Sequence, residues 1–376
     1  MTHERSRIRI MLLAAARPNF MKVAPLYKVL LADDSFELAL VHTGQHYDDN
    51  MSGTFLRELG LPDPNHHLEV GSGSHAQQTA DVMKRLEPVL ISEKPAALIV
   101  VGDVNSTLAG ALTAAKLHIP VVHAEAGLRS FDRSMPEEIN RIATDSVSDL
   151  LLITEESART NLLHEGKTPD QIAFVGNLMI DSLRVQLARA LASNVRERLG
   201  ITEAHIGLVT LHRPSNVDDP RQLDEILSAL EVISGELPLY WPVHPRTRSR
   251  LNTETAPLPS SIHLLDPLGY SDFLYLQANC AAVLTDSGGI QEESTVLGVP
   301  CLTLRDNTER PVTVESGTNY LAGTSAHRIL ETWRESRSHP KPGTIPPLWD
   351  GQAAARSHAA IKQFLLTRER LGQRRS

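Results

Sequence analysis

The sequence contains little cysteine, with only Cys280 and Cys301 among its 376 residues. Two cysteines cannot form the disulfide framework of a small secreted protein, and these two lack the spacing of metal ligands. We therefore expect a reducing, cytoplasmic location and no metal site.

The sequence also lacks a basic excess and a long apolar stretch. Lys and Arg total 37 against 45 Asp and Glu, so the net charge is −8. A nucleic-acid-binding surface is normally basic, so we expect no nucleic-acid partner. No stretch approaches the ~20 apolar residues of a membrane span, so we expect no membrane insertion. The run Ile10–Ala16 resembles a short signal peptide, but Arg17 and Pro18 end it, and a buried strand explains it better.

What the sequence does contain is an alternation of short apolar runs and longer helical patterns. Its length suggests two domains of ~150 residues or more. Continuous apolar strands separated by helices are typical of a parallel sheet covered on both faces. The predicted strands of the first half are Ile8–Ala16, Phe36–His42, Ala97–Val101 and Pro120–His123, and its predicted helices are Met21–Leu31, Ala76–Ser92 and Ser106–Leu117.

The same pattern restarts in the second half. Its predicted strands are Ile206–Leu211, Leu239–Val243, Ile262–Leu265, Ala281–Thr285 and Val299–Leu304. We place a domain boundary near Gly176-Asn177, before the helical stretch Ile180–Leu199. The prediction is an α/β protein with two doubly wound domains. The first comprises residues 1–176 and is completed by a C-terminal helix at 353–376; the second comprises residues 177–352.

Reactive side chains follow the predicted strands in both halves. Ligands of open α/β sheets bind at the carboxyl ends of strands, so we expect a ligand-binding cleft between the domains. The residues at these positions are Arg17, Asp103, Glu125, His212, His244 and Asp286.

The segment Asp286–Ile290 runs from a strand into a helix through Ser287, Gly288 and Gly289. Small residues there let backbone N–H groups approach a phosphate. A helix cap by Asp286 or Ser287 explains the same pattern, and both interpretations stay open. Glu292 and Glu293 favour the phosphate interpretation, because acidic side chains suit ribose hydroxyls.

The carboxylates have structural alternatives too. Asp103 could cap the helix that follows it, and Ser134-x-x-Glu137 has the form of a capping box, which explains Glu137 without catalysis. Glu125, between small residues after a buried strand, needs a partner or a solvated cleft. Gly71–Ala76 matches G-x-G-x-x-G/A but follows no buried strand, so we expect no nicotinamide cofactor.

Seven motifs recur in one order along the chain: Arg17–Leu26, Gly102-Asp103, His123–Arg129, Pro136–Arg141, Pro242–Pro245, Thr285–Glu293 and Thr308–Pro311. With these motifs the chain resembles the non-hydrolysing UDP-N-acetylglucosamine 2-epimerases over nearly its whole length. The resemblance implies a GT-B fold of two Rossmann-like domains, a homodimer and a UDP-sugar substrate without cofactor. It also implies interconversion of UDP-GlcNAc and UDP-ManNAc for polysaccharide synthesis, through loss and re-addition of UDP.

The resemblance assigns roles by motif match. Asp103, Glu125 and Glu137 become acid/base candidates, and His212 a further catalytic or phosphate-binding group. The substrate-binding candidates are Arg17, Lys22, Arg141, His244, Ser287, Gly288, Gly289, Glu293 and Arg310.

Some motifs depart from the commonest bacterial pattern. The opening Ala15–Asn19, with Ser130–Arg133, is similar to a branch that includes epimerases of UDP-diacetamido uronic acids. That substrate is therefore an alternative. A GT-B glycosyltransferase, a hydrolysing epimerase and a catalytically inactive nucleotide-sugar sensor are others, since fold does not determine function.

Overall fold

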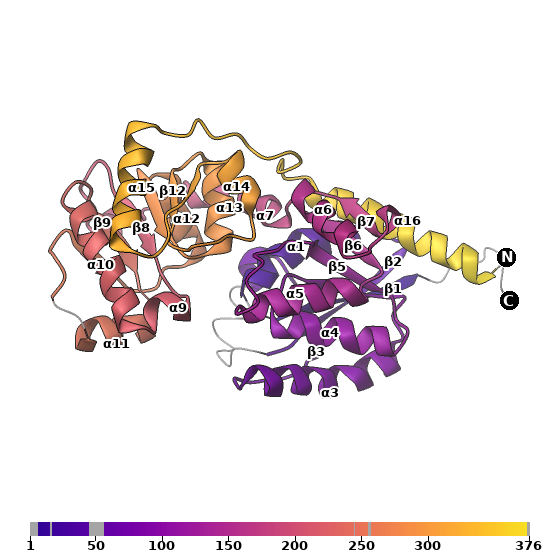
Figure 1. The fold of residues 1–376 in the computed structure, drawn as a ribbon. Coiled ribbons are helices and arrows are strands. Elements are labelled where there is room, and N and C mark those ends of the chain that lie inside the picture. The colour runs from indigo at the N-terminus through magenta and orange to yellow at the C-terminus, as the bar shows by residue number, and fades with distance from the viewer. Residues whose placement is uncertain (1–6, 16, 45–55, 244, 255–256, 374–376) are drawn as a thin grey trace. The chain divides into compact units, whose positions relative to one another are not determined.

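The computed structural model describes residues 7–15, 17–44, 56–243, 245–254 and 257–373. The chain forms two compact units, Met1–Ser182 with Pro347–Ser376, and Leu183–Pro346. Each unit is an α/β layer structure (Figure 1). Among the described residues, no helix is both long and apolar enough to cross a membrane.

The first unit is built on a seven-stranded parallel sheet in the order β3-β2-β1-β4-β5-β6-β7. The chain begins in the middle, builds to one edge, returns beside β1 and builds to the other edge. This reversal is the switch point of a doubly wound fold, so the predicted fold class is confirmed here. The strands are β1 (Ile8–Ala14), β2 (Phe36–His42), β3 (His66–His67), β4 (Ala97–Val101), β5 (Val121–Ala126), β6 (Leu150–Ile153) and β7 (Ile172–Phe174).

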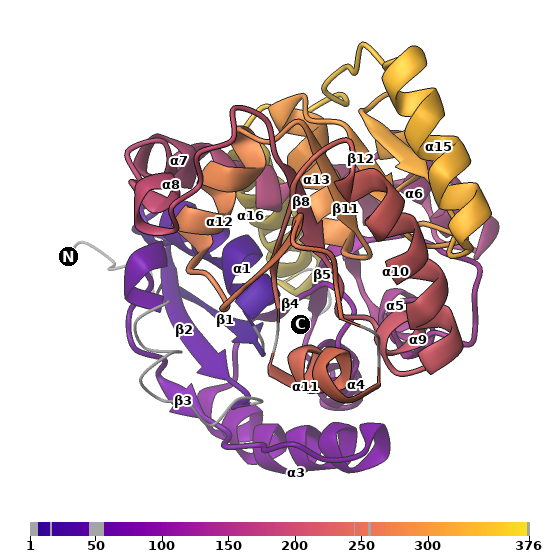
Figure 2. The same cartoon turned by 90° about the vertical axis from the view of Figure 1, so that its left-hand side faces the viewer.

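Helices cover both faces of this sheet. On one face α3, α4 and α5 pack in a row, and on the other α1 packs against α16 (Figures 1 and 2). A cluster of fully buried side chains, among them Met11, Leu86 and Val100, fills the space beneath α3 and α4. The helices are α1 (Arg17–Leu31), α3 (His75–Glu93), α4 (Asn105–Lys116), α5 (Pro136–Val147), α6 (Glu156–His164), the short 3-10 helix η1 (Pro169–Gln171) and α16 (Ala353–Gln373).

Hydrogen bonds attach the C-terminal helix α16 and the residues before it to the first unit. The carboxylate of Asp181 accepts hydrogen bonds from the backbone N–H groups of Ala353 (3.1 Å) and Ala354 (2.8 Å), which caps the start of α16. Just before it, the buried Trp349 donates from Nε1 to the carbonyl of Thr154 at 3.0 Å. These contacts attach the returning chain to the end of β6.

The second unit repeats the topology. Its six-stranded parallel sheet has the order β10-β9-β8-β11-β12-β13, with the same reversal between β8 and β11. Trp241 and Trp333 are buried in its largest core cluster. The strands are β8 (Gly207–Thr210), β9 (Leu239–Pro242), β10 (Ile262–Leu265), β11 (Ala282–Thr285), β12 (Cys301–Thr303) and β13 (Asn319–Leu321).

The helices of the second unit surround this sheet. Helix α7 (Leu178–Ala190) begins in the first unit and ends in the second. A loop separates α7 from α8, so the stretch Ile180–Leu199 is two helices rather than the one helical stretch predicted. The others are α8 (Val195–Arg198), α9 (Pro214–Val217), α10 (Pro220–Ser234), α11 (Pro245–Glu254), α12 (Tyr270–Ala278), α13 (Gly288–Leu297), α14 (Pro311–Glu315) and α15 (Ala326–Ser338).

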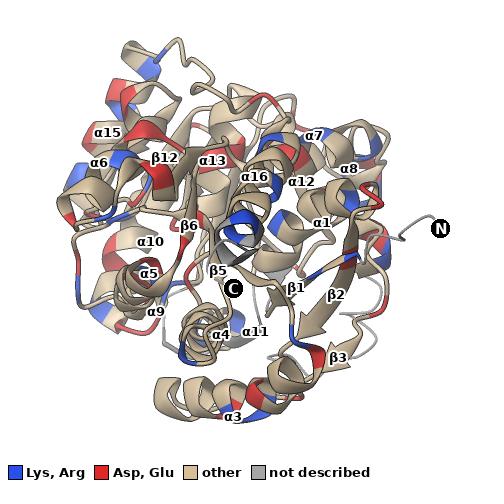
Figure 3. Ribbon diagram, turned by 90° about the vertical axis from the view of Figure 1, so that its right-hand side faces the viewer, with Lys and Arg blue, Asp and Glu red and all other residues tan. Residues whose placement is uncertain are grey.

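Acidic and basic residues are interspersed along the described helices of both units (Figure 3). Helices α3 and α15 carry both signs, whereas the charged residues of α1 are all basic and those of α13 are all acidic.

Candidate functional site

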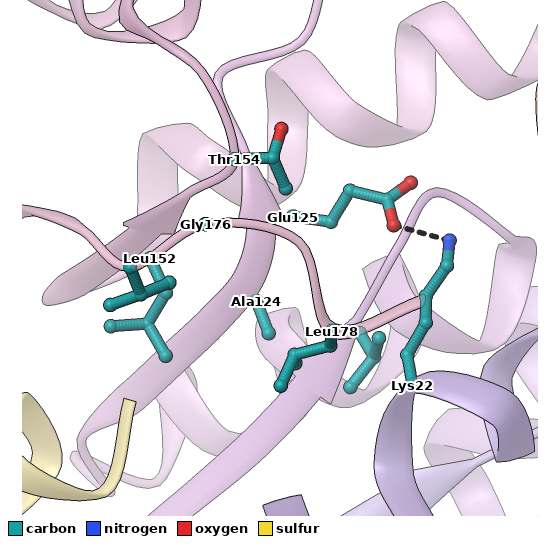
Figure 4. A pocket seen from close by; sticks show the side chains of 9 residues that line it. Lys22, Ala124, Glu125, Leu152, Thr154, Gly176 and Leu178 are labelled. Atoms are coloured by element: carbon teal, nitrogen blue, oxygen red, sulfur yellow. Dashed lines mark ion pairs between the residues drawn. The ribbon is translucent and has the colours of Figure 1, made fainter. Parts of the chain in front are cut away.

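Two ion pairs lie where β4 and β5 of the first unit end. Lys22 of α1 pairs through Nζ with a carboxylate oxygen of Glu125, and both side chains are buried. Figure 4 shows them pointing toward each other from α1 and β5. Arg141 of α5 pairs with Asp103, which follows β4, at 2.5 Å between Nη2 and Oδ2. The structure thus brings four of the predicted site residues together as two carboxylate–cation pairs.

Glu125 stands on a strained stretch of backbone. Its φ is 70°, in the left-handed region that residues other than glycine seldom adopt. The β5–β6 register shifts between Ala124 and Ala126, so Glu125 is the extra residue of a bulge. Gly127, two residues later, also has a positive φ of 80°. Strain of this kind is frequent at functional sites, because the surrounding structure holds it in place.

A narrow cavity opens beside the Lys22–Glu125 pair. Its volume is about 10 Å³, close to the space that one water molecule requires. Thr154 lines it, and its buried hydroxyl has no hydrogen-bond partner among the described residues. In Figure 4 the Glu125 carboxylate points toward Lys22, and the Thr154 oxygen points away from that pair. Because Thr154 and Glu125 both line the cavity, a water molecule held there would have polar groups of both residues within reach.

Asp103 does not cap the helix that follows it. Val104, not Asp103, is the N-cap residue of α4, and the side chain of Val104 makes no capping hydrogen bond. The carboxylate of Asp103 pairs with Arg141 instead, while Asn140 donates from Nδ2 to the Asp103 backbone carbonyl at 2.9 Å. The helix-cap alternative for Asp103 is therefore wrong, and α5 holds this residue through two consecutive side chains.

The capping box predicted at Ser134 and Glu137 is also wrong. Pro136 occupies the first helical position of α5, so Met135 is the N-cap residue and Glu137 is second in the helix. Ser134 bonds to Asp132 instead, at 2.6 Å between Oγ and Oδ1. Glu137 is half-buried in the first turn of α5, and its role is not explained by capping.

Sequence reasoning missed Glu138. This buried carboxylate accepts hydrogen bonds from the backbone N–H groups of Ser130 (3.0 Å) and Phe131 (2.9 Å) and also pairs with Arg141. It therefore holds the loop after β5 and the cation that contacts Asp103. The available signal was its position as the third residue of α5, counted from Pro136, from which a Glu side chain can reach back to preceding N–H groups.

In the second unit, Asp286 joins the ends of β8 and β11. Its fully buried carboxylate accepts the backbone N–H groups of His212 (3.0 Å) and Arg213 (2.9 Å) and lies 2.8 Å from Nδ1 of His212. Burial raises the pKa of Asp286, but hydrogen bonds from the His212 ring and these N–H groups outweigh it, so the pKa falls below its usual value. The His212 side chain is 59% exposed, and the contact with Asp286 directs Nε2 away from that carboxylate.

Arg310 lies against the glycine turn that begins α13. A Cβ atom added to Gly288 would come within 2.5 Å of Nη1 of Arg310, so a larger residue there would force the Arg310 guanidinium to shift. Arg310 is buried and held by Glu292 (2.6 Å from Nε) and Glu309 (2.5 Å from Nη1). Ser287 is the N-cap residue of α13, but its hydroxyl makes no capping bond. The capping alternative therefore does not account for the side chain of Ser287.

Glu293 is buried one turn into α13. Tyr270 of α12 donates from its hydroxyl to Oε1 of Glu293 at 2.7 Å. Burial, reinforced by the neighbouring Glu292, raises the pKa of Glu293 to about 7, although hydrogen bonds from Tyr270 and Gln277 oppose the rise. Burial and Glu293 raise the pKa of Tyr270 well above 10. Sequence reasoning did not single out Tyr270 or Gln277.

The family model of UDP-N-acetylglucosamine 2-epimerases matches residues 28–362. The chain belongs to this family.

Curated relatives agree with this assignment and widen the range of substrates. A UDP-N-acetylglucosamine 2-epimerase of Methanocaldococcus jannaschii is 41% identical over 333 residues, 86% of this chain and 91% of the relative. A UDP-2,3-diacetamido-2,3-dideoxy-D-glucuronate 2-epimerase of Pseudomonas aeruginosa is also 41% identical, over 88% of this chain and 92% of the relative.

The crystal structure of the Methanocaldococcus jannaschii UDP-GlcNAc 2-epimerase in complex with UDP-GlcNAc and UDP superposes on this chain with a TM-score of 0.87. It is 38% identical and covers 95% of this chain and all of that chain. The GT-B fold expected for the family is thereby confirmed.

The predicted site residues are distributed over both units. Lys22, Asp103, Glu125, Glu137 and Arg141 lie in the first unit, and His212, Ser287, Gly288, Gly289, Glu293 and Arg310 in the second. The side chain of Arg17 and the whole of His244 lie outside the described residues. No group of three or more His, Cys, Asp or Glu side chains among the described residues could hold a metal ion.

The glycine-rich segment Gly71–Ala76 has a structural function. Ser74 caps α3, and Gln77 completes a capping box with it. The local sequence therefore starts a helix and caps it.

Proposed function

We propose that the protein is an isomerase, a non-hydrolysing UDP-N-acetylglucosamine 2-epimerase that interconverts UDP-GlcNAc and UDP-ManNAc for polysaccharide synthesis. The proposal is supported by the family membership and by the relatives and bound structure described above. The observation that carries it is the pair of carboxylates, Asp103 and Glu125, which lie at the carboxyl ends of adjacent strands and are each held by a cation. Val101 pairs with Ala124 across these strands, so the two acidic residues leave the sheet side by side.

The reaction requires acid–base chemistry on both faces of C2. A base removes the C2 proton while the C1–O bond breaks, and UDP departs with that electron pair, leaving a C1=C2 double bond. An acid then protonates C2 from the opposite face, and UDP adds back to C1. Asp103, Glu125 and Glu137 supply candidate acids and bases, because epimerisation needs proton transfer on each face. These steps account for every proton and electron pair without a cofactor.

Departure of UDP requires donors for the diphosphate. The N-terminus of α13, with Ser287, Gly288 and Gly289, offers backbone N–H groups and the positive end of the helix dipole. We assign diphosphate contacts to this segment, Arg310 and His212, and ribose contacts to Glu293. Lys22, Arg141, Arg17 and His244 complete the proposed substrate-binding set.

One experiment separates this proposal from its alternatives. The protein is incubated in D₂O with UDP-GlcNAc alone, and the products are analysed by NMR. An epimerase puts deuterium at C2 of both UDP-GlcNAc and UDP-ManNAc. A glycosyltransferase shows no C2 exchange without an acceptor, a sensor binds without exchange, and a hydrolysing enzyme releases free ManNAc and UDP. Any of these three outcomes would contradict the proposal.

We extend the proposal to assembly and location. A homodimer is supported by the family resemblance, and sedimentation equilibrium should give twice the chain mass of 41.3 kDa. A cytoplasmic location is supported by Cys280 and Cys301, which are both buried free thiols. Subcellular fractionation tests the location.

A further inference from the structure

A buried charge network lies beneath the carboxyl ends of β4 and β5, where Asp103 and Glu125 are located. His123 of β5 and Asp145 of α5 are fully buried, and Arg129 is 3% exposed. Nδ1 of His123 lies 2.6 Å from Oδ1 of Asp145, and Nη2 of Arg129 lies 2.7 Å from Oδ2. Glu165 completes the network with bonds to Nε (2.8 Å) and Nη2 (2.6 Å) of Arg129. None of these four side chains has a place in the chemistry proposed above.

The geometry determines which atoms of His123 carry protons. Nε2 lies 2.8 Å from the backbone carbonyl of Gly102, which can only accept, so Nε2 must donate. Burial raises the pKa of Asp145, but His123 and Arg129 outweigh it, and the pKa lies below its usual value. Asp145 is therefore a carboxylate, and Nδ1 donates to it. His123 thus uses both ring nitrogens as donors, to the helix on one side and to the loop after β4 on the other.

The network reaches both proposed acid/base residues through the backbone. Gly102, which accepts from His123, directly precedes Asp103 and has a φ of 72°. Gly127, two residues after Glu125, donates its N–H to Oδ2 of Asp145 at 3.0 Å. One carboxylate on α5 therefore holds the segments after two neighbouring strands. Arg141, one turn earlier on α5, holds the Asp103 side chain itself.

We propose that His123 and Asp145 are positioning residues for the epimerisation, setting the spacing between Asp103 and Glu125 without contacting the substrate. The inference rests on the proposed function, which makes these two carboxylates the acid/base groups. Proton transfer depends steeply on geometry, and a 1 Å misplacement of reacting groups can cost about 100-fold in rate. The diphosphate contacts proposed for α13 and Arg310 do not involve this network. Its loss should therefore lower kcat far more than it weakens UDP binding.

The test compares His123→Gln, His123→Leu and Asp145→Asn in the full-length protein. A glutamine amide can still donate toward Gly102, whereas leucine cannot, so His123→Gln should retain more activity than His123→Leu. We expect kcat to fall about 10–100-fold in His123→Gln and Asp145→Asn, with KM for UDP-GlcNAc and the calorimetric Kd for UDP within about threefold of wild type.

A matched control exists in the same unit. His358 of α16 forms a similar pair with Asp33, 2.7 Å between Nε2 and Oδ2, and contacts neither loop. His358→Gln removes the same chemical group and should leave kcat unchanged. Hydrogen exchange measured by mass spectrometry adds a readout that does not depend on activity. Peptides covering residues 102–105 and 125–129 should exchange faster in His123→Gln and Asp145→Asn and at the wild-type rate in His358→Gln.

Three outcomes would overturn the inference. The first is near-wild-type kcat in folded His123→Gln and Asp145→Asn. The second is a fall in kcat accompanied by an equal loss of UDP affinity. The third is failure of both variants to fold where His358→Gln folds, which would make the pair a requirement of the fold. A failure of the proposed function is separate, since wild type itself would then show no deuterium uptake at C2 while the exchange measurement still reports on the loops.

Discussion

Glu125 combines burial, a cation partner and a strained backbone at one position. Its φ of 70° and its pairing with Lys22 fix the carboxylate at the carboxyl end of β5. A general acid or base contributes about 10²–10⁴-fold to a rate. We therefore expect Glu125→Gln to lower kcat by about that factor while the fold and UDP affinity persist, as measured by circular dichroism and calorimetry.

A control for Glu125→Gln should change charge without touching the site. Glu156, at the start of α6, is exposed and pairs only locally, with Arg159 at 2.9 Å. Glu156→Gln should leave turnover unchanged. Near-native turnover in a folded Glu125→Gln variant would remove this residue from the acid/base set.

Glu293 makes stability depend on pH. Its pKa is about 7 in the folded protein against 4.5 for an unperturbed carboxyl, because burial disfavours the charge. The folded state therefore binds a proton that the unfolded state has lost between pH 4.5 and 7. The contribution of Glu293 to the free energy of unfolding is therefore fully present below pH 4.5. It is lost as the pH rises through 7, at a rate of up to about 1.4 kcal/mol per pH unit.

Substitution isolates this contribution. Glu293→Gln keeps an acceptor for the Tyr270 hydroxyl but cannot ionise. We expect urea denaturation without UDP to show the wild type losing stability relative to Glu293→Gln between pH 5 and 8, by roughly 1–3 kcal/mol. Parallel pH profiles for the two proteins would mean that Glu293 ionises without cost in the fold.

At the scale of the element, a glycine turn at the start of α13 shapes the segment proposed to bind the diphosphate. Gly288 leaves room for the Arg310 guanidinium, which Glu292 and Glu309 orient. A hydrogen bond to a charged group contributes about 1.5–3 kcal/mol. Arg310→Ala should therefore weaken UDP binding by about 10–100-fold in calorimetry, and Ser287→Ala should weaken it less. Unchanged affinity in both variants would show that this segment serves only the fold.

Gly288→Ala probes the same element without removing a polar group. The added methyl would displace Arg310, so we expect UDP affinity to fall although every proposed donor remains. Gly235→Ala is the matched control, because a Cβ there would meet only the Val232 carbonyl, at 3.3 Å, at the end of α10.

Several elements were predictable from sequence because their signal is local. The strands Phe36–His42, Ala97–Val101 and Ile262–Leu265 have the predicted bounds, since continuous apolar runs mark buried parallel strands. Strands β3, β7 and β13 have two or three residues each, too few for any periodic signal. The start of α5 was misplaced because Pro136 takes the first helical position, which moves the cap from Ser134 to Met135.

The candidate site was predictable only in part. Residues at strand ends could be named, because the fold places them at one edge of the sheet. Their partners could not: Asp286 beside His212, Tyr270 beside Glu293 and Asp145 beside His123 are separated by 74, 23 and 22 residues. Such pairings depend on tertiary packing, which no local pattern encodes.

At the scale of the whole molecule, sequence identity does not select between two substrates. The relatives acting on UDP-GlcNAc and on the diacetamido uronate are each 41% identical to this chain. The substrates differ physically, because the uronate has a carboxylate on the sugar in addition to the diphosphate charge. The choice can therefore be argued from charge.

The charge distribution favours UDP-GlcNAc. A buried carboxylate on the sugar would need a cation of its own. In the described part of the first unit, the buried cations Lys22, Arg129 and Arg141 each pair with a carboxylate of the protein, so a sugar carboxylate would have to compete with that carboxylate for any of them. The net charge of −8 further disfavours the more anionic ligand at a distance. We expect kcat/KM for UDP-GlcNAc to exceed that for the diacetamido uronate by about 100-fold, the effect of roughly 2.7 kcal/mol. Chromatographic separation of the epimers of each substrate measures both values, and a preference for the uronate would mean that a cation outside these pairs recognises the sugar carboxylate.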